Sequence, residues 1–160
     1  MKRFAALLVL AGMFLVQAPS VLAASPVETH TEVRKNVVES FPEADPCLGQ
    51  ITVNLVYNDV FHITEFVAGP NAGTVHVTFT QAGKFLLETD DPDLPDYSGS
   101  FAIWGGFNGN RQSASGTFTF NAIGSAPDGT RVRQHAIEHF NVTPGGLENE
   151  FFFETLDCPL

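Results

Sequence analysis

The chain has 160 residues, a formal net charge of −10 and a pI near 4.7. Such a charge repels the phosphates of nucleic acids and the headgroups of anionic membranes, so we expect neither as a partner. Hydrophobic residues make up 44% of the chain, which is enough for one domain with a substantial core and excludes a disordered or highly charged class.

Residues 1–23 have the features of a secretory signal peptide. Lys2 and Arg3 form a basic start, an apolar run extends from Phe4 to Val16, and Val21-Leu-Ala23 has small residues where a signal peptidase reads. The apolar run is too short for a membrane-spanning helix, which needs roughly 20 residues. We therefore expect a secreted, extracellular protein that keeps no membrane segment after cleavage.

The exported part is expected to begin with a flexible lead over residues 24–36, which are polar and lack a hydrophobic period. Residues 37–160 are expected to form the folded domain. A first strand is predicted within Val33–Phe41, with a short helix as the alternative. Pro42 and Pro46 would end either one.

From Ile51 onward, alternation with a period of two predicts a succession of strands. Asn58-Asp59, Ala82-Gly83 and Gly105-Gly106 are interpreted as turns or interruptions, and Asp90–Asp96 as a loop. The expected strands cover residues 51–57, 60–67, 74–81, 84–89, 98–106, 115–123, 130–142 and 148–157. Evenly spaced short strands with hairpin-length turns predict an all-β, antiparallel fold of about seven or eight strands. A single β-barrel is favoured because closure removes exposed edges, and a β-sandwich is the alternative.

The chain has two cysteines, Cys47 and Cys158, and both lie in the part expected to be exported. Disulfides form and persist outside the cell, and two cysteines allow only one pairing. A bridge would enclose almost the whole domain. Two free thiols are the alternative, and the absence of a CxxC spacing disfavours a metal site.

The segment Asp45-Pro-Cys-Leu-Gly-Gln50 resembles an element of small secreted proteins, common in actinobacteria and of uncharacterised function. Their element reads Asn-Pro-Cys-x-Gly-Glu, so Asp45 and Gln50 depart from it. The family follows it with a histidine-containing strand, here Val60-Phe-His-Ile-Thr64, and ends in a single cysteine, here Cys158. The resemblance spans roughly residues 37–158. It implies one secreted β-domain with a Cys47–Cys158 bridge and no assigned catalytic residues.

No nucleophile elbow, Walker loop, HExxH or Rossmann fingerprint occurs in the sequence. His135 and His139 lie about 13 Å apart along one predicted strand, too far to chelate one metal together, although His62 or His76 could approach either from another strand. The aspartates of residues 90–96 lack the DxDxDG spacing of a calcium loop. We therefore expect no metal and no cofactor.

Assigning faces to the predicted strands selects the candidate ligand-binding residues. If the more apolar face of each strand points inward, Glu65 faces inward with Phe61. Gln134 and Glu138 then face inward with Phe140, and the four strand histidines fall outward. An inward carboxylate is costly unless it is hydrated, paired or protonated. Glu65 and Glu138 therefore either lie at solvated strand ends or line a ligand cavity.

Three functions fit these residues. The first is a non-enzymatic, secreted binding domain for a small, partly apolar ligand, with a pocket in the barrel or at a mouth lined by Phe101 and Trp104. The second is a small barrel enzyme, an isomerase, cyclase or hydrolase, with Glu65 and Glu138 as general acid and base. The third is a structural or surface-interaction protein. The 15 phenylalanines and the lack of a catalytic signature favour the binding domain.

Overall fold

A computed structural model describes residues 27–110, 112–143 and 146–158, and for residues 147–150 it describes the backbone alone. The expected signal peptide over residues 1–23 lies outside the described residues. No helix long and apolar enough to cross a membrane occurs in the described part of the chain.

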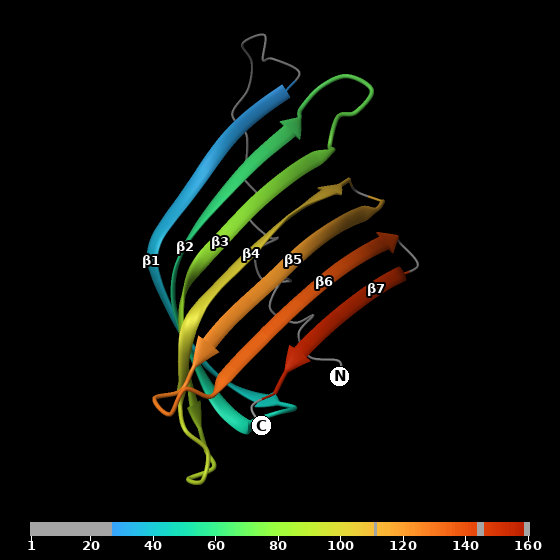
Figure 1. Cartoon of the computed structure of the whole chain (residues 1–160). Coiled ribbons are helices and arrows are strands. Elements are labelled where there is room, and N and C mark those ends of the chain that lie inside the picture. Colours follow the sequence, from blue (N-terminus) through green and yellow to red (C-terminus); the bar gives the residue numbers. More distant parts are fainter. Residues whose placement is uncertain (1–26, 111, 144–145, 159–160) are drawn as a thin grey trace.

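The described strands form one seven-stranded antiparallel sheet in which every strand pairs with its neighbours in sequence (Figure 1). The strands are β1 (Val27–Asp45), β2 (Gly49–Phe66), β3 (Val75–Thr89), β4 (Tyr97–Gly109), β5 (Ala114–Ser125), β6 (Arg131–Thr143) and β7 (Gly146–Asp157). The all-β, antiparallel prediction is confirmed. The sheet is open, with β1 and β7 as its two edges, so closure into a barrel is not confirmed. Because all these strands share one sheet, the structure also differs from a sandwich, which needs two.

The sheet is strongly curved, and the disulfide lies where its two edges approach one another. In Figure 1 the turn between β1 and β2 bends round to the end of β7. Cys47, in that turn, is bonded to Cys158, and their Cα atoms are 5.4 Å apart, a usual separation for a disulfide. The predicted bridge is therefore present, and it holds together the two ends of a sheet that backbone pairing leaves open.

The hydrophobic core fills the bridged end of the sheet. Its buried members are Leu48, Ile51, Tyr57, Phe85, Tyr97, Phe101, Ala126 and Val132, and Cys47 packs against them. They come from β2, β3, β4 and β6 and from two of the turns, so residues far apart in the sequence gather on one face of the curved sheet. The bridge and the core therefore stabilise the same region.

Two predicted interruptions were wrong, because β2 and β3 run through them without a break. Asp59 lies within β2 and is only 1% exposed, since Arg34 on β1 satisfies its carboxylate. Gly83 lies within β3, opposite Tyr57 on one side and Phe101 on the other. The rings of these two neighbours meet edge to face, 6.1 Å apart, on the same side of the sheet. Asp59 and Gly83 each resemble a strand break in the local sequence. In the structure, partners on neighbouring strands allow both to lie within a continuous strand.

The expected flexible lead was also wrong from Val27 on, because β1 begins there. Residues 27–34 pair with residues 59–66 of β2, so backbone hydrogen bonding rather than hydrophobic alternation defines this part of the strand. A bulge follows at Lys35 and Asn36, which together lie opposite Asn58. Asn36 has a φ of 53°, and its backbone N–H donates to the side-chain oxygen of Asn58 over 2.9 Å.

Glycines within the strands make room for aromatic rings. A Cβ atom on Gly124 would lie 2.6 Å from the ring of Phe85, and one on Gly99 would lie 2.7 Å from it. Phe85 therefore lies across two neighbouring glycines of β4 and β5 in the core. Gly105 and Gly106, interpreted above as turn residues, also lie within β4. A Cβ on Gly105 would come within 2.3 Å of the Thr117 carbonyl oxygen on β5, so this position requires glycine.

Candidate functional site

The two faces of the sheet differ in chemistry, and the strand register assigns each residue to one of them. Directly opposed residues of an antiparallel pair point to the same side. We call the side that carries the core the concave face and the other side the convex face. Tyr57, Phe61, Gln81, Ile103, Phe120 and Ala136 illustrate the concave face in neighbouring strands.

Away from the core, one row of opposed residues crosses the concave face from edge to edge. We call it the phenylalanine row: Glu32, Phe61, Phe79, Gly105, Phe118, Glu138 and Phe152, one from each strand in order. The rings of Phe61 and Phe79 stack with centroids 5.8 Å apart and planes 24° apart. Phe61, Phe79 and Phe118 are only half-buried, and Phe152 at the edge is 45% exposed. This face therefore offers an aromatic surface that the domain itself leaves partly uncovered.

Beside this row, an ion pair joins the first two strands on the same face. Arg34 donates from Nε to Oδ1 of Asp59 over 3.0 Å and from its terminal nitrogen to Oδ2 over 2.5 Å. This hydrogen-bonded fork raises the pKa of Arg34 above its ordinary value. The guanidinium also lies 5.4 Å from the ring centroid of Phe61. Arg34 is thus held by a carboxylate and placed against the phenylalanine row.

This pair was not predicted from the sequence, although the alternation contains a signal for it. Asp59 has the same parity as Tyr57 and Phe61, which places all three on one face. A carboxylate with that parity requires a partner, and Arg34 is the cation on the neighbouring strand. The missing information was the position of β1, whose start the sequence does not mark.

The pKa of Tyr57, a buried residue of the concave face, lies well above its ordinary value. Its hydroxyl donates to Oε1 of Glu39 over 2.7 Å, and its side chain is 4% exposed. Burial first, and then the hydrogen bond to Glu39, raise the pKa of Tyr57 to about 12. Burial likewise raises the pKa of Tyr97, the other tyrosine of the chain.

These tyrosines give a pH-dependent stability that can be measured. In the unfolded chain a phenol titrates near ~10. The contribution of Tyr57 is therefore fully present below about pH 10 and is lost as the pH rises from there to about 12. Phenolate absorbance of the folded protein should show no tyrosine with an ordinary pKa. Tyr57→Phe should flatten the fall of stability over that window, and an unchanged slope in this variant would contradict the assignment.

The structure places Glu65 and Glu138 on the concave face, as the sequence predicts, but on separate parts of it. Glu65 lies near the end of β2, opposite Val75 and Glu28. Glu138 lies mid-strand in β6, four positions further along the register and four strands away from β2. It is 9% exposed and interacts within the domain. Strand pairing does not place the two carboxylates next to each other, as a general acid and base pair requires.

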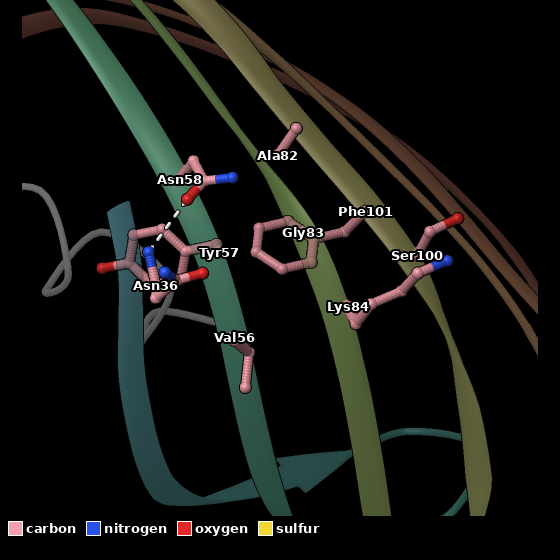
Figure 2. Close-up of a pocket in the computed structure, with 9 residues that line it drawn as sticks. All are labelled: Asn36, Val56, Tyr57, Asn58, Ala82, Gly83, Lys84, Ser100 and Phe101. Atoms are coloured by element: carbon pink, nitrogen blue, oxygen red, sulfur yellow. Dashed lines mark hydrogen bonds between the residues drawn. The ribbon is translucent and has the colours of Figure 1, made fainter. Parts of the chain in front are cut away.

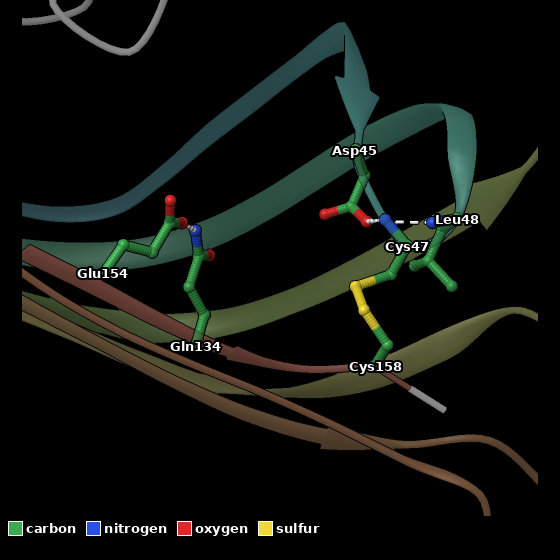
Figure 3. Close-up of a disulfide and its surroundings, with 6 residues drawn as sticks. All are labelled: Asp45, Cys47, Leu48, Gln134, Glu154 and Cys158. Atoms are coloured by element: carbon green, nitrogen blue, oxygen red, sulfur yellow. Dashed lines mark hydrogen bonds between the residues drawn. A yellow bond between two sulfur atoms is a disulfide. The ribbon is translucent and has the colours of Figure 1, made fainter. Parts of the chain in front are cut away.

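Gln134 also faces the concave side, near the disulfide. Its Nε2 donates to Oε1 of Glu154 on β7 over 2.6 Å, and both side chains extend from β6 and β7 toward β1 and β2 (Figure 3). In the same view the carboxylate of Asp45 accepts hydrogen bonds from the backbone N–H groups of Cys47 (2.8 Å) and Leu48 (2.9 Å). Asp45 thus fixes the turn that presents Cys47. Gln134 belongs to this bridged end rather than to a site with Glu65.

Trp104 lies on the convex face, which corrects its expected place beside Phe101. It stands opposite Thr80 and Thr119 and is 43% exposed. Phe101 is buried in the core on the other side of β4. Because side chains alternate along a strand, residues 101 and 104 point in opposite directions. The position of Trp104 on the opposite face from Phe101 was therefore predictable from the sequence.

The four histidines of the predicted strands lie on the convex face, as the face assignment predicts, and each has a cross-strand partner. His30, in the part of β1 that the sequence does not predict, lies on the concave face, 3.6 Å from Glu32. His62 contacts Thr31 over 2.9 Å, His139 contacts Thr117 over 2.7 Å, and His135 contacts Asn121 over 2.6 Å. His76 contacts Asn108. Each of these histidines therefore has an ordinary structural role, as a polar residue that bonds to the neighbouring strand on the sheet surface.

The acidic loop uses its carboxylates within its own backbone. Asp96 accepts from the backbone N–H of Thr89 over 3.0 Å, and Asp91 accepts from that of Asp93 over 2.9 Å. Within the described ranges, no group of three or more histidine, cysteine or acidic residues is arranged to hold a metal ion.

Two shallow hollows of the surface lie beside Lys84. The larger, about 380 Å³, surrounds Gly83 and is lined largely by convex-face residues: Val56, Asn58, Ala82, Lys84 and Ser100 (Figure 2). The second, about 330 Å³, extends from Lys84 to Ile123 and Arg131. Both are open to solvent, and neither is lined by Glu65, Trp104, Gln134 or Glu138, although Phe101 lines the larger one. Neither hollow includes a residue of the phenylalanine row.

Comparison with protein families, with curated proteins and with solved structures finds no match to this chain.

Proposed function

We propose that the chain is a secreted, non-enzymatic binding domain that takes up a small, partly apolar ligand on its concave face. The observation that carries the proposal is the phenylalanine row, whose rings are half-buried while the core beside it is fully packed. Exposed apolar surface is retained where it contacts something else. The signal-peptide pattern of residues 1–23 and the disulfide support an extracellular location.

The curvature of the sheet supports a ligand of small-molecule size. A flat sheet offers contact on one side only, whereas a curved one surrounds part of a ligand. The bridge between Cys47 and Cys158 maintains this curvature at one end and leaves the row accessible from the β7 edge, where Phe152 is exposed. The open sheet thus serves the purpose of the barrel interior that the sequence predicts.

The test uses Nile red, a neutral dye whose fluorescence increases in apolar surroundings. Phe118→Ala removes a ring from the middle of the row and should weaken dye binding severalfold. Ile123→Ala is a matched control because Ile123 lies on the same strand, is 56% exposed and faces the convex side. Circular dichroism confirms that both variants are folded. No binding by the wild type, or equal loss in the two variants, would refute the proposal.

A further inference from the structure

The charges of the concave face determine which charge an apolar ligand of this face can carry. The described carboxylates on this face are Glu28, Glu32, Glu39, Glu43, Asp45, Asp59, Glu65, Glu138 and Glu154, as the register assigns them. His30 also lies on this face, 3.6 Å from Glu32. Arg34 lies there too, but Asp59 neutralises it through two hydrogen bonds. Lys84, Arg131 and Arg133 all lie on the convex face. The field over the phenylalanine row is therefore negative, and it repels fatty acids and other anionic amphiphiles.

Glu138 is the carboxylate best placed to meet a cation within the row. Its cross-strand neighbours are Phe118 and Phe152, and Phe140 lies two residues along the same strand on the same face. Aromatic rings attract cations through their negative faces, and a carboxylate in such surroundings adds a charge-assisted contact that water screens only partly. A ligand cation at this position would add to the contacts that Glu138 already makes within the domain.

The dimensions of the row fit an elongated apolar body. Four interstrand steps separate Phe61 on β2 from Glu138 on β6, about 19 Å along the sheet. Phe79 and Phe118 lie between them, and Gly105 contributes no side chain. At the β7 edge no further strand covers Phe152 in the described part of the chain, so a ligand can enter beside Glu138.

We propose that the phenylalanine row binds a cationic amphiphile, with its ammonium or amidinium group against Glu138 and its apolar body across Phe118, Phe79 and Phe61. This inference rests on the proposed function and specifies the class of its ligand. Charge complementarity determines the choice, because neither a neutral nor an anionic amphiphile would use Glu138.

The test compares three probes that share one alkyl chain: decyltrimethylammonium, decyl maltoside and decyl sulfate. Each is titrated below its micelle concentration by calorimetry, while circular dichroism monitors the fold. The cationic probe should bind at least tenfold more tightly than the maltoside, and the sulfate more weakly than either. Added salt should weaken the cationic probe selectively, because screening reduces its attraction to the carboxylate.

Two matched variants locate the effect. Glu138→Gln should remove most of the preference for the cationic probe and leave maltoside binding unchanged. Glu88→Gln removes the same charge from the convex face, where Glu88 accepts from Asn54, and should change neither. Phe152→Ala, at an exposed edge position, should also lower the cationic affinity and keeps the test available if Glu138→Gln does not fold.

The outcomes separate the two proposals. Equal affinity for the cationic and neutral probes would overturn the cation site and leave the proposed function intact. Binding of none of the probes would overturn both. Equal losses in Glu138→Gln and Glu88→Gln would show a general charge effect and would also overturn the site.

Discussion

The double variant Cys47→Ser/Cys158→Ser is expected to lose about 4–5 kcal/mol of unfolding free energy. The bridge links residues 111 positions apart, and a cross-link of that length removes much of the conformational freedom of the unfolded chain. Total stabilities of single domains are about 5–15 kcal/mol, so this is a large share. The melting temperature should fall by roughly 10–20 °C.

The bridge should matter more here than the entropy of the unfolded chain alone suggests. No backbone pairing joins β1 to β7, so the disulfide is the direct connection between the two ends of the sheet in the described residues. Urea denaturation of the oxidised protein, the reduced protein and the double variant measures the loss. The reduced protein and the variant should agree with one another. A loss below about 1 kcal/mol would mean that the core at this end holds the curvature unaided.

Arg34→Ala is expected to cost about 3 kcal/mol, because it leaves the carboxylate of Asp59 without its two donors at a position that is 1% exposed. Arg34→Lys should recover only part of this loss, since an ammonium cannot form the two-nitrogen fork. Replacing both partners, as in Arg34→Met with Asp59→Leu, should restore most of the stability because no buried charge remains.

Urea denaturation of these three variants measures the series. Arg131→Ala is the matched control: Arg131 is an exposed arginine of the convex face, and its removal should change stability by less than about 0.5 kcal/mol. If Arg34→Ala behaves like this control, water satisfies Asp59 in solution, and the ion pair does not stabilise the junction of β1 and β2.

Alternation of side chains made the two faces predictable from the sequence. It placed Glu65, Gln134 and Glu138 on one side and the strand histidines on the other, because the period of a strand is fixed by its geometry. The same rule assigns Trp104 to the convex face. Its expected place at a cavity mouth followed from its size and its nearness to Phe101 in sequence, which say nothing about direction.

Features that depend on partners distant in sequence could not be predicted. Asp59 reads as a strand break until Arg34, 25 residues earlier, is known to lie beside it. Gly83 reads as a turn until Tyr57 and Phe101 are found on the strands that flank it. The extent of closure is set by accumulated twist and curvature over all the strands, which no single segment encodes. The phenylalanine row likewise exists only once the register of the seven strands is known.

The connection between Cys47 and Cys158 also sets an order of events in folding. Each hairpin of the sheet pairs neighbouring segments, so pairing can proceed strand by strand as the chain is synthesised. The sulfur of Cys47 is in place after the first hairpin, but its partner follows the seventh strand. The bond can therefore form only after all seven strands have been synthesised, so an oxidised molecule is one that carries the complete sheet sequence.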